Sequence, residues 1–323
     1  MNKIIRFLTL ILVTVSFSAC ENNIEFPDRL EEKYMVLYSM AEAGKPVLAS
    51  VGESVFFLDD VPIQNWRKDA TVSLYINGEF IEHLKVYDRN PPHQPVDGDE
   101  YYKSDAIVHS GDEVRIEASL PDFDEVASGS TTVPHPTLVA DVKVISLVPN
   151  ENGNGYYGKL QITFSDDKNS NDYYWVSAKK RAEYYPEHPD WPVNWADVKY
   201  EDKIFAEKFD YIIDAFGEPK RSYSYGFFDD RSINGIEKYP LTLGFYHNPE
   251  VSKGPLTFDI SLCTIDENYY KYLKSYRQSF DNSVLQEPVQ VHSNIKNGIG
   301  LVVSKANSIS EELYQFDVAK KYD

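Results

Sequence analysis

Short alternations of apolar and polar residues, separated by turn residues, run through the chain from residue 34 onward. An alternation with a period of two is typical of a strand that buries one face. In the stretch 71–76 the alternation predicts Val72, Leu74 and Ile76 on the core face, with Thr71, Ser73 and Tyr75 on the solvent face. Similar stretches in this half of the chain occur at 35–40, 80–86 and 113–118.

The clearest local signal is the dipeptide Asn77-Gly78, which joins the stretch 71–76 to the residues 79–81. Asn-Gly supplies the positive φ angles of a type I′ turn, so it predicts a β-hairpin. With the other stretches it indicates an immunoglobulin-like β-sandwich over residues 34–136. One Gly and two prolines within 128–136 end the pattern, and we place the module boundary near residue 136.

A second β-rich module is predicted over residues 137–323. Strand-like runs occur at 139–147, 159–164, 173–178, 256–265 and 299–303, the last read as a final core strand. A single short helix is predicted over 266–280, because four apolar or aromatic residues recur at helical spacing and Asp266 can cap its start. We therefore expect a mainly all-β protein.

The first 19 residues have the layout of a secretory signal peptide, with Lys3 and Arg6 ahead of an apolar run at 7–17. That run is shorter than the ~20 apolar residues that a membrane-spanning helix needs. Residues 17–20, Phe-Ser-Ala-Cys, resemble a bacterial lipobox, in which Cys20 becomes the first residue and carries lipid, with palmitate as an expected acyl chain. An ordinary signal peptide with an incidental Cys is the alternative. Residues 20–33 then form a polar, acidic tether.

The net charge of the chain argues against one class of partner. The chain has 32 Lys and Arg against 51 Asp and Glu, a formal net charge of −19. This balance repels phosphate backbones and argues against a nucleic-acid partner. Once Cys20 is lipidated, Cys263 has no partner for an intrachain disulfide, and we expect it to be a buried structural thiol.

Enzyme motifs are absent from the local sequence. There is no His-Glu-x-x-His, no Gly-x-Ser-x-Gly, no P-loop and no Gly-x-Gly-x-x-Gly, and the seven histidines are scattered. The sequence therefore favours a protein without enzymatic activity. A surface glycan hydrolase stays open as an alternative, because its two carboxylates, about 5 to 10 Å apart, meet only in the folded chain.

The best cation candidate is the run 166–172, which offers hard oxygen ligands from Asp166, Asp167, Asn169 and Asp172. Calcium prefers such ligands. The run lacks EF-hand spacing, and Asp and Asn in turns commonly bond their own backbone, so a structural turn is the favoured interpretation and calcium is the alternative. A second run, 229–235, has the same character. No other cofactor is expected.

An aromatic insertion lies at about 182–226, where rings are interleaved with prolines that oppose regular structure. Large rings on a loop either pack into a small local core or form a recognition surface. Local packing is the favoured interpretation. The binding hypothesis names Tyr184, Tyr185, Trp191 and Trp195 as contacts for a ligand or partner.

Several short motifs follow one another in a fixed order after Cys20. They are Thr132-Val133-Pro134, Phe164-Ser165-Asp166, Asn171-Asp172-Tyr173-Tyr174, Phe227-Phe228-Asp229-Asp230, Tyr270-Lys271-Tyr272-Leu273, Glu287-Pro288-Val289 and Asn297-Gly298-Ile299-Gly300. This order resembles the Bacteroidota lipoprotein family called domain of unknown function 4249. The resemblance covers nearly the whole mature chain and is most specific at 287–300, whereas the aromatic insertion departs from the family pattern.

The resemblance implies an outer-membrane lipoprotein of a kind that is often encoded beside a TonB-dependent transporter, and it implies no catalytic residues. We therefore expect a lipid-anchored protein, either periplasmic or exposed at the cell surface, that captures a ligand for a TonB-dependent transporter or another outer-membrane barrel, or packs against it. A structural or adhesive surface protein is the alternative.

Overall fold

The computed structural model describes residues 33–55, 65–87, 102–150, 153, 155–182, 194–206, 226–252, 254–280 and 289–317. The predicted signal peptide, Cys20 and nearly all of the tether lie outside these residues. So do Tyr184, Tyr185 and Trp191 of the aromatic insertion. Within the described part of the chain, no helix is both long and apolar enough to cross a membrane.

In the first half of the chain, the described residues form nine short strands. They are β1 (Met35–Glu42), β2 (Pro46–Glu53), β3 (Asn65–Arg67), β4 (Thr71–Ile76), β5 (Glu79–His83), β6 (Lys85–Val86), β7 (Tyr102–Ile107), β8 (Glu113–Ser119) and β9 (Ala127–Thr132).

The second half begins with β10 (Val139–Pro149), β11 (Tyr156–Phe164), β12 (Tyr173–Arg181), β13 (Trp195–Asp197) and β14 (Lys199–Tyr200). It continues with β15 (Phe227–Asp229), β16 (Tyr239–His247), β17 (Leu256–Ile265), α3 (Glu267–Phe280) and β18 (Ile299–Phe316). Two 3₁₀ turns, η1 (Lys203–Phe205) and η2 (Asp230–Ser232), complete the described elements. The expectation of a mainly all-β protein with one short helix is confirmed, since α3 is the only α-helix that the structure describes.

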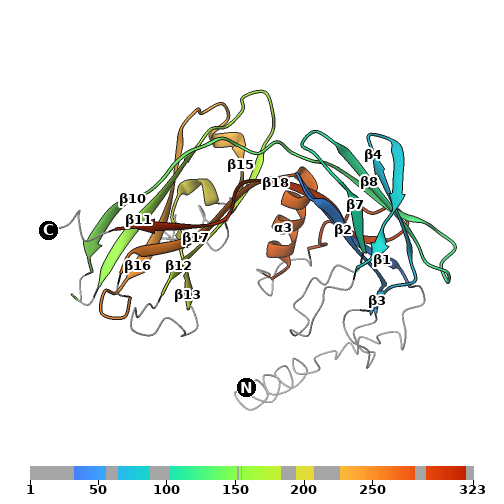
Figure 1. Ribbon diagram of the computed structural model, residues 1–323, viewed down its shortest axis with the longest axis horizontal. Coiled ribbons are helices and arrows are strands. Elements are labelled where there is room, and N and C mark those ends of the chain that lie inside the picture. The colour runs from blue at the N-terminus through green and yellow to red at the C-terminus, as the bar shows by residue number, and fades with distance from the viewer. Residues whose placement is uncertain are drawn as a thin grey trace, which may run out of the picture.

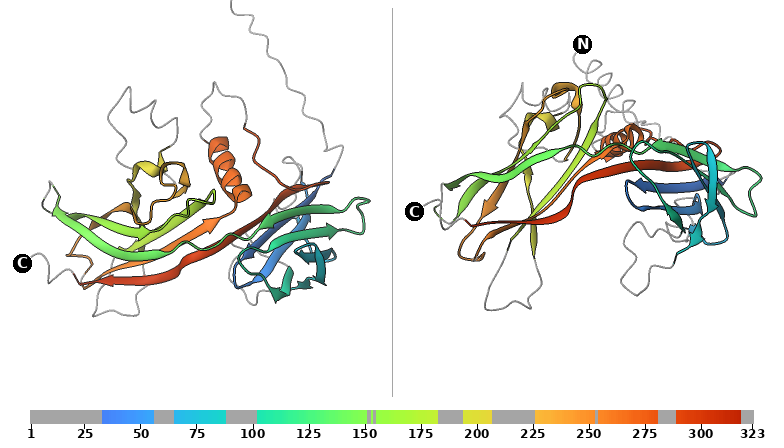
Figure 2. Two further views of the ribbon diagram at one scale, coloured as in Figure 1. Left: turned by 90° about the horizontal axis from the view of Figure 1, so that it is seen from above. Right: turned by 45° about the horizontal axis from the view of Figure 1, so that its top comes forward.

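The described strands form three sheets, which build two β-sandwiches that share one long strand (Figure 1). The largest sheet has the order β13-β12-β17-β18-β1-β2-β7-β6 and runs through both halves of the molecule. The first part of β18 pairs in parallel with β1, and its last part pairs antiparallel with β17. Figure 2 shows β18, in red, passing from one sandwich into the other.

The N-terminal sandwich closes when the sheet β5-β4-β8-β9 packs on the β1 and β2 end of the large sheet. The predicted hairpin is present, with φ of 53° at Asn77 and 84° at Gly78. Val72 and Leu74 are fully buried in this core, as their alternation predicts. Val302, from β18, belongs to the same core.

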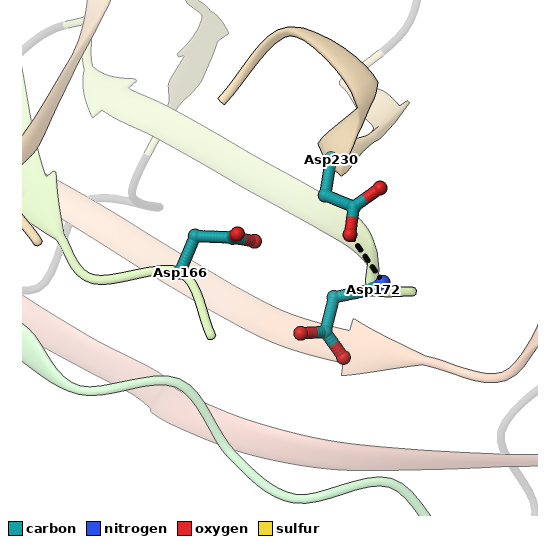
Figure 3. A group of neighbouring side chains, drawn as sticks. All are labelled: Asp166, Asp172 and Asp230. Carbon is teal, nitrogen blue, oxygen red and sulfur yellow. Dashed lines mark hydrogen bonds between the residues drawn. The ribbon is translucent and has the colours of Figure 1, made fainter. Parts of the chain in front are cut away.

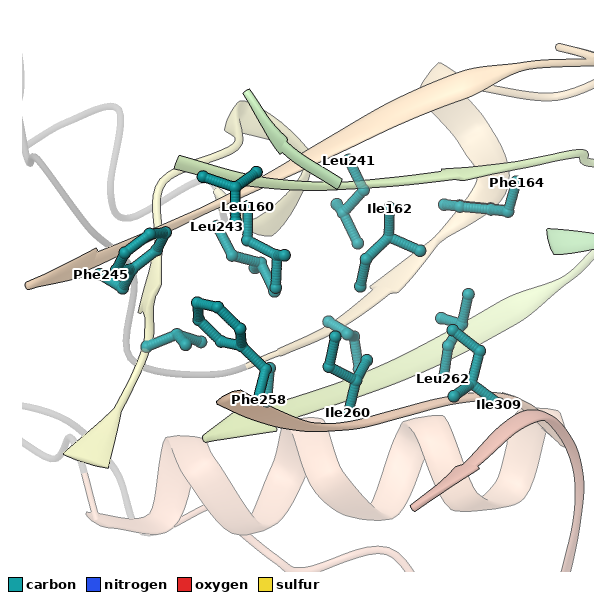
Figure 4. Close-up of a cluster of buried hydrophobic side chains, with 14 of the residues drawn as sticks. Leu160, Ile162, Phe164, Leu241, Leu243, Phe245, Phe258, Ile260, Leu262 and Ile309 are labelled. Carbon is teal, nitrogen blue, oxygen red and sulfur yellow. The ribbon is translucent and has the colours of Figure 1, made fainter. Parts of the chain in front are cut away.

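The C-terminal sandwich packs the sheet β10-β11-β16-β14 on β12, β17 and the last part of β18. Figure 4 shows its interior, where Leu160 and Ile162 from one sheet face Ile260 and Leu262 from the other. Ile309 of β18 also packs there. One strand therefore supplies side chains to both cores, although the predicted boundary near residue 136 assigns all of it to the second module.

Helix α3 begins at the predicted cap. The Tyr269 backbone N–H donates to Asp266 Oδ1 at 2.6 Å, and the Tyr270 N–H donates to the Asp266 carbonyl oxygen. Such a cap satisfies N–H groups that the first helical turn leaves without partners. Cys263, three residues earlier, is a buried free thiol, and burial raises its pKa to about 11. This confirms the expectation of an inert structural Cys.

Candidate functional site

A cavity of about 980 Å³ lies where the two sandwiches meet. One wall comes from the end of β9 and the connection 133–138 that leads into β10. Further lining comes from the loop after β11 and the first residues of β12, and the end of β17 with the start of α3 completes it. Because the walls come from both sandwiches, a molecule in this cleft would contact both.

The lining of the cleft is acidic. Asp166, Asp167, Asp172, Asp266 and Glu267 all contribute to it. Among the described lining residues, only His135 has a side chain that can carry positive charge. A cleft of this composition favours a ligand with positive charge.

Three of the chain's carboxylates converge at one wall of the cleft. Oxygen atoms of Asp166, Asp172 and Asp230 lie within 4.8 Å of one another (Figure 3). Asp166 follows β11, Asp172 precedes β12 and Asp230 begins η2, so the group joins the two Asp-rich runs of the sequence. Asp166 and Asp172 line the cavity, and Asp230 is buried beside them.

Asp166 is held by two neutral donors. The Tyr174 hydroxyl donates to its Oδ1 at 2.6 Å, and the Gly235 backbone N–H donates to its Oδ2 at 2.8 Å. Burial, followed by the bond to Asp166, raises the pKa of Tyr174 far above its ordinary value. The tyrosine therefore stays protonated and keeps donating.

Two hydrogen bonds join Asp172 and Asp230, and a backbone N–H group donates each of them. The Asp172 N–H donates to Asp230 Oδ2 at 2.9 Å, and the Asp230 N–H donates to the Asp172 carbonyl oxygen at 3.0 Å. Burial raises the pKa of both carboxyl groups, and the neighbouring charge of Asp166 raises it further. Each carboxylate is thus less stable in its charged form than it would be in water.

The remaining candidates of the two Asp-rich runs do not join this group. Asp167 Oδ1 accepts bonds from the backbone and side chain of Asn169, an Asx turn of the kind that the sequence favours. Asp229 pairs with Arg231 at 2.7 Å and accepts a bond from the Tyr270 hydroxyl. Although burial raises its pKa, the bond and charge of Arg231 bring that pKa below the ordinary value.

Asp266, which also lines the cleft, connects the two sandwiches. Its Oδ2 accepts from the Ser304 backbone N–H at 2.7 Å, from the Ser304 hydroxyl and from the Thr131 hydroxyl. Its Oδ1 caps α3. Thr131 lies on β9 of the N-terminal sandwich, so this one carboxylate joins β9, β18 and the helix. The sequence indicated the cap but gave no sign of the other bonds.

The aromatic residues of the insertion lie apart from this cleft as far as the structure describes them. Trp195 is the first residue of β13, pairs with Arg181 and is 37% exposed. Tyr200 packs on Phe205, beside the C-terminal core. The binding role of Tyr184, Tyr185, Trp191 and Trp195 stays a prediction.

The family model described as "Domain of unknown function (DUF4249)" matches residues 21–316. This match confirms the family resemblance that the ordered motifs indicate. No curated protein matches the chain.

Proposed function

This chain belongs to the DUF4249 family, and we propose that it is a non-enzymatic, lipid-anchored outer-membrane protein that captures a ligand between its two sandwiches. The observation that carries the proposal is the acidic cleft. Its volume of about 980 Å³ falls in the range of small-molecule sites, roughly 300–1,000 Å³. Its walls come from both sandwiches, which is a common position for a binding site.

The proposed anchor is Cys20, and the proposed partner is a TonB-dependent barrel. The segment 20–33 has enough residues to reach roughly 50 Å when fully extended, at about 3.3–3.6 Å a residue. The anchored body could therefore stand away from the membrane surface and meet the mouth of a barrel. Family resemblance supports this partner and a bacterial outer membrane of the Bacteroidota type.

The test is a mild-detergent extraction of the full-length protein from its native membrane, followed by affinity capture and mass spectrometry. We expect a TonB-dependent barrel in stoichiometric amount, and we expect Cys20→Ala to lose both the membrane fraction and the barrel. A protein that is captured alone from the membrane would contradict the transporter role and would favour the structural or adhesive alternative.

A further inference from the structure

We propose that an aromatic face on the N-terminal sandwich and helix α3 rests on the lipid bilayer and orients the anchored protein there. Six side chains define this aromatic face: Tyr34, Val36, Tyr38, Trp66, Tyr276 and Ile299. The inference rests on the lipid anchor that the proposed function includes, and it goes beyond that function by naming the surface that meets the lipid.

The large sheet builds one row of the aromatic face across four strands. Val36 and Tyr38 project away from the N-terminal core, because the residues of β1 that alternate with them are buried in it. Ile299 of β18 lies opposite Val36, and Val36 lies opposite Gly52 of β2. Gly52 in turn lies opposite Trp66 of β3. The rings of Tyr38 and Trp66 meet edge to face, with centroids 5.9 Å apart.

Helix α3, which packs on β18, brings two further rings to the same surface (Figure 1). Tyr272 and Tyr276 stack with their centroids 5.7 Å apart. Burial, followed by the neighbouring Tyr276, raises the pKa of Tyr38. Burial, followed by Tyr38 and Tyr276, raises the pKa of Tyr272. The three hydroxyls therefore lie near one another, and the sheet and the helix form one surface.

Much of the aromatic face is open to solvent. Tyr34, Tyr38, Tyr276 and Ile299 are exposed by 46%, 40%, 45% and 42%. Leu301, two residues after Ile299 on the same face of β18, is only 4% exposed, since α3 packs on this strand. Contiguous exposed apolar patches mark surfaces that meet another molecule or a membrane.

The composition of the aromatic face favours a lipid surface. Its six side chains carry no charge, and four of them are Tyr or Trp. These rings have an apolar body and a polar tip, and they gather where hydrocarbon meets water. Next to the aromatic face, Lys33 pairs with Glu53 at 3.0 Å, so this ion pair brings no net charge toward the lipid.

The position of the tether selects the membrane over other partners. Tyr34 directly follows the predicted tether 20–33, so a lipid on Cys20 keeps Tyr34 within roughly 50 Å of the bilayer, at about 3.3–3.6 Å a residue. A tethered contact forms within one molecule, so a weak affinity for lipid is enough to bring the aromatic face onto the surface. The tether length is an upper limit, and the body can therefore rest on the bilayer.

The test is hydroxyl-radical footprinting, read by mass spectrometry, of the full-length lipidated protein in phosphatidylcholine vesicles and of the soluble Cys20→Ala protein. We expect the oxidation rates of the three tyrosines in the aromatic face to fall by about threefold or more in vesicles, because lipid covers their rings. Tyr246 and Phe80 are internal controls, since they are 45% and 51% exposed and lie outside the aromatic face. Their rates should not change.

A second measurement does not depend on the anchor. Dye-labelled Cys20→Ala protein is equilibrated with the same vesicles without washing, and fluorescence correlation spectroscopy measures the bound fraction. We expect weak binding that added sodium chloride does not reduce, because the aromatic face is uncharged. Adding Tyr38→Ser with Tyr276→Ser should weaken this binding by about tenfold, since two rings lose their contact with lipid. The matched control adds Tyr246→Ser with Phe80→Ser and should bind as before.

The inference is overturned if the tyrosines of the aromatic face keep their oxidation rates in vesicles, or if the control residues lose theirs equally. Protection that requires native membranes containing the barrel would assign the aromatic face to the barrel instead. Protection that grows with the concentration of soluble Cys20→Ala protein would assign it to a second copy of the chain. If Cys20 proves to carry no lipid, the vesicle-binding comparison still decides this inference, so the two proposals fail separately.

Discussion

Replacing Lys180 with Met should stabilise the C-terminal sandwich. Lys180 lies on β12, is 2% exposed and projects to the core side of the sheet, as Val176 and Ala178 do. Within the described residues its ammonium group donates only to the Arg181 carbonyl oxygen, at 2.8 Å, and pairs with no carboxylate. Burial lowers the pKa of Lys180 from 10.5 to about 8. The part of the fold that the structure describes therefore holds a buried charge without a counter-ion at neutral pH.

The size and the sign of the effect follow from this pKa. A lowering from 10.5 to about 8 corresponds to at most about 3 kcal/mol, and relaxation around the charge reduces it, so we expect about 1–3 kcal/mol. Because the folded-state pKa is the lower one, the cost is fully present below about pH 8 and disappears as the pH rises through 10.5. Met keeps the length and apolar stem of Lys and removes the charge.

Urea unfolding of wild-type protein, Lys180→Met and Lys179→Met measures this effect. Lys179 is the exposed neighbour on the same strand, so its variant controls for the loss of a surface charge. We expect Lys180→Met alone to raise the free energy of unfolding near neutral pH, with the gain shrinking above about pH 8. A Lys180→Met protein that is less stable than wild type would refute the reasoning, because it would mean that the ammonium group has a stabilising partner.

Three further predictions follow from the same structure. Burial, and then the charge of Lys180, lower the pKa of His247 to about 4. We expect this pKa to rise in Lys180→Met, and an NMR titration of the imidazole would measure it. An unchanged pKa would mean that burial alone sets it. Asp266→Asn should lower the free energy of unfolding by about 1–3 kcal/mol, because the new amide group cannot accept all four hydrogen bonds that the carboxylate accepts. Chemical denaturation would measure the difference. A variant as stable as the wild-type protein would contradict the prediction. Gly300→Ala should lower the thermal unfolding temperature far more than Gly153→Ala. A Cβ at residue 300 would collide with the β1 backbone, whereas the space around residue 153 is open. Equal decreases in the unfolding temperature would show that the positive φ angle, which both glycines have, dominates the effect.

Local sequence predicts the turns of the candidate site but not which of their carboxylates meet in the folded chain. The runs 166–172 and 229–235 each read as a turn, and for Asp167 and Asn169 that interpretation is correct. The meeting of Asp166 and Asp172 with Asp230 depends on β15 pairing with β12, which brings together residues far apart in the chain. An acidic turn has the same local pattern whether or not a second one lies against it.

The sequence by itself determined the features that depend on near neighbours: the alternation of Val72 and Leu74, the hairpin at Asn77-Gly78 and the Asp266 cap. Each is fixed within a few residues by backbone geometry or by the period of the strand. Only the tertiary structure decided that β18 serves both cores and that Lys180 is buried, and it alone formed the cleft between the sandwiches. The physical reason is that strand pairing and burial are set by long-range packing, and a period of two identifies a strand without identifying its neighbour.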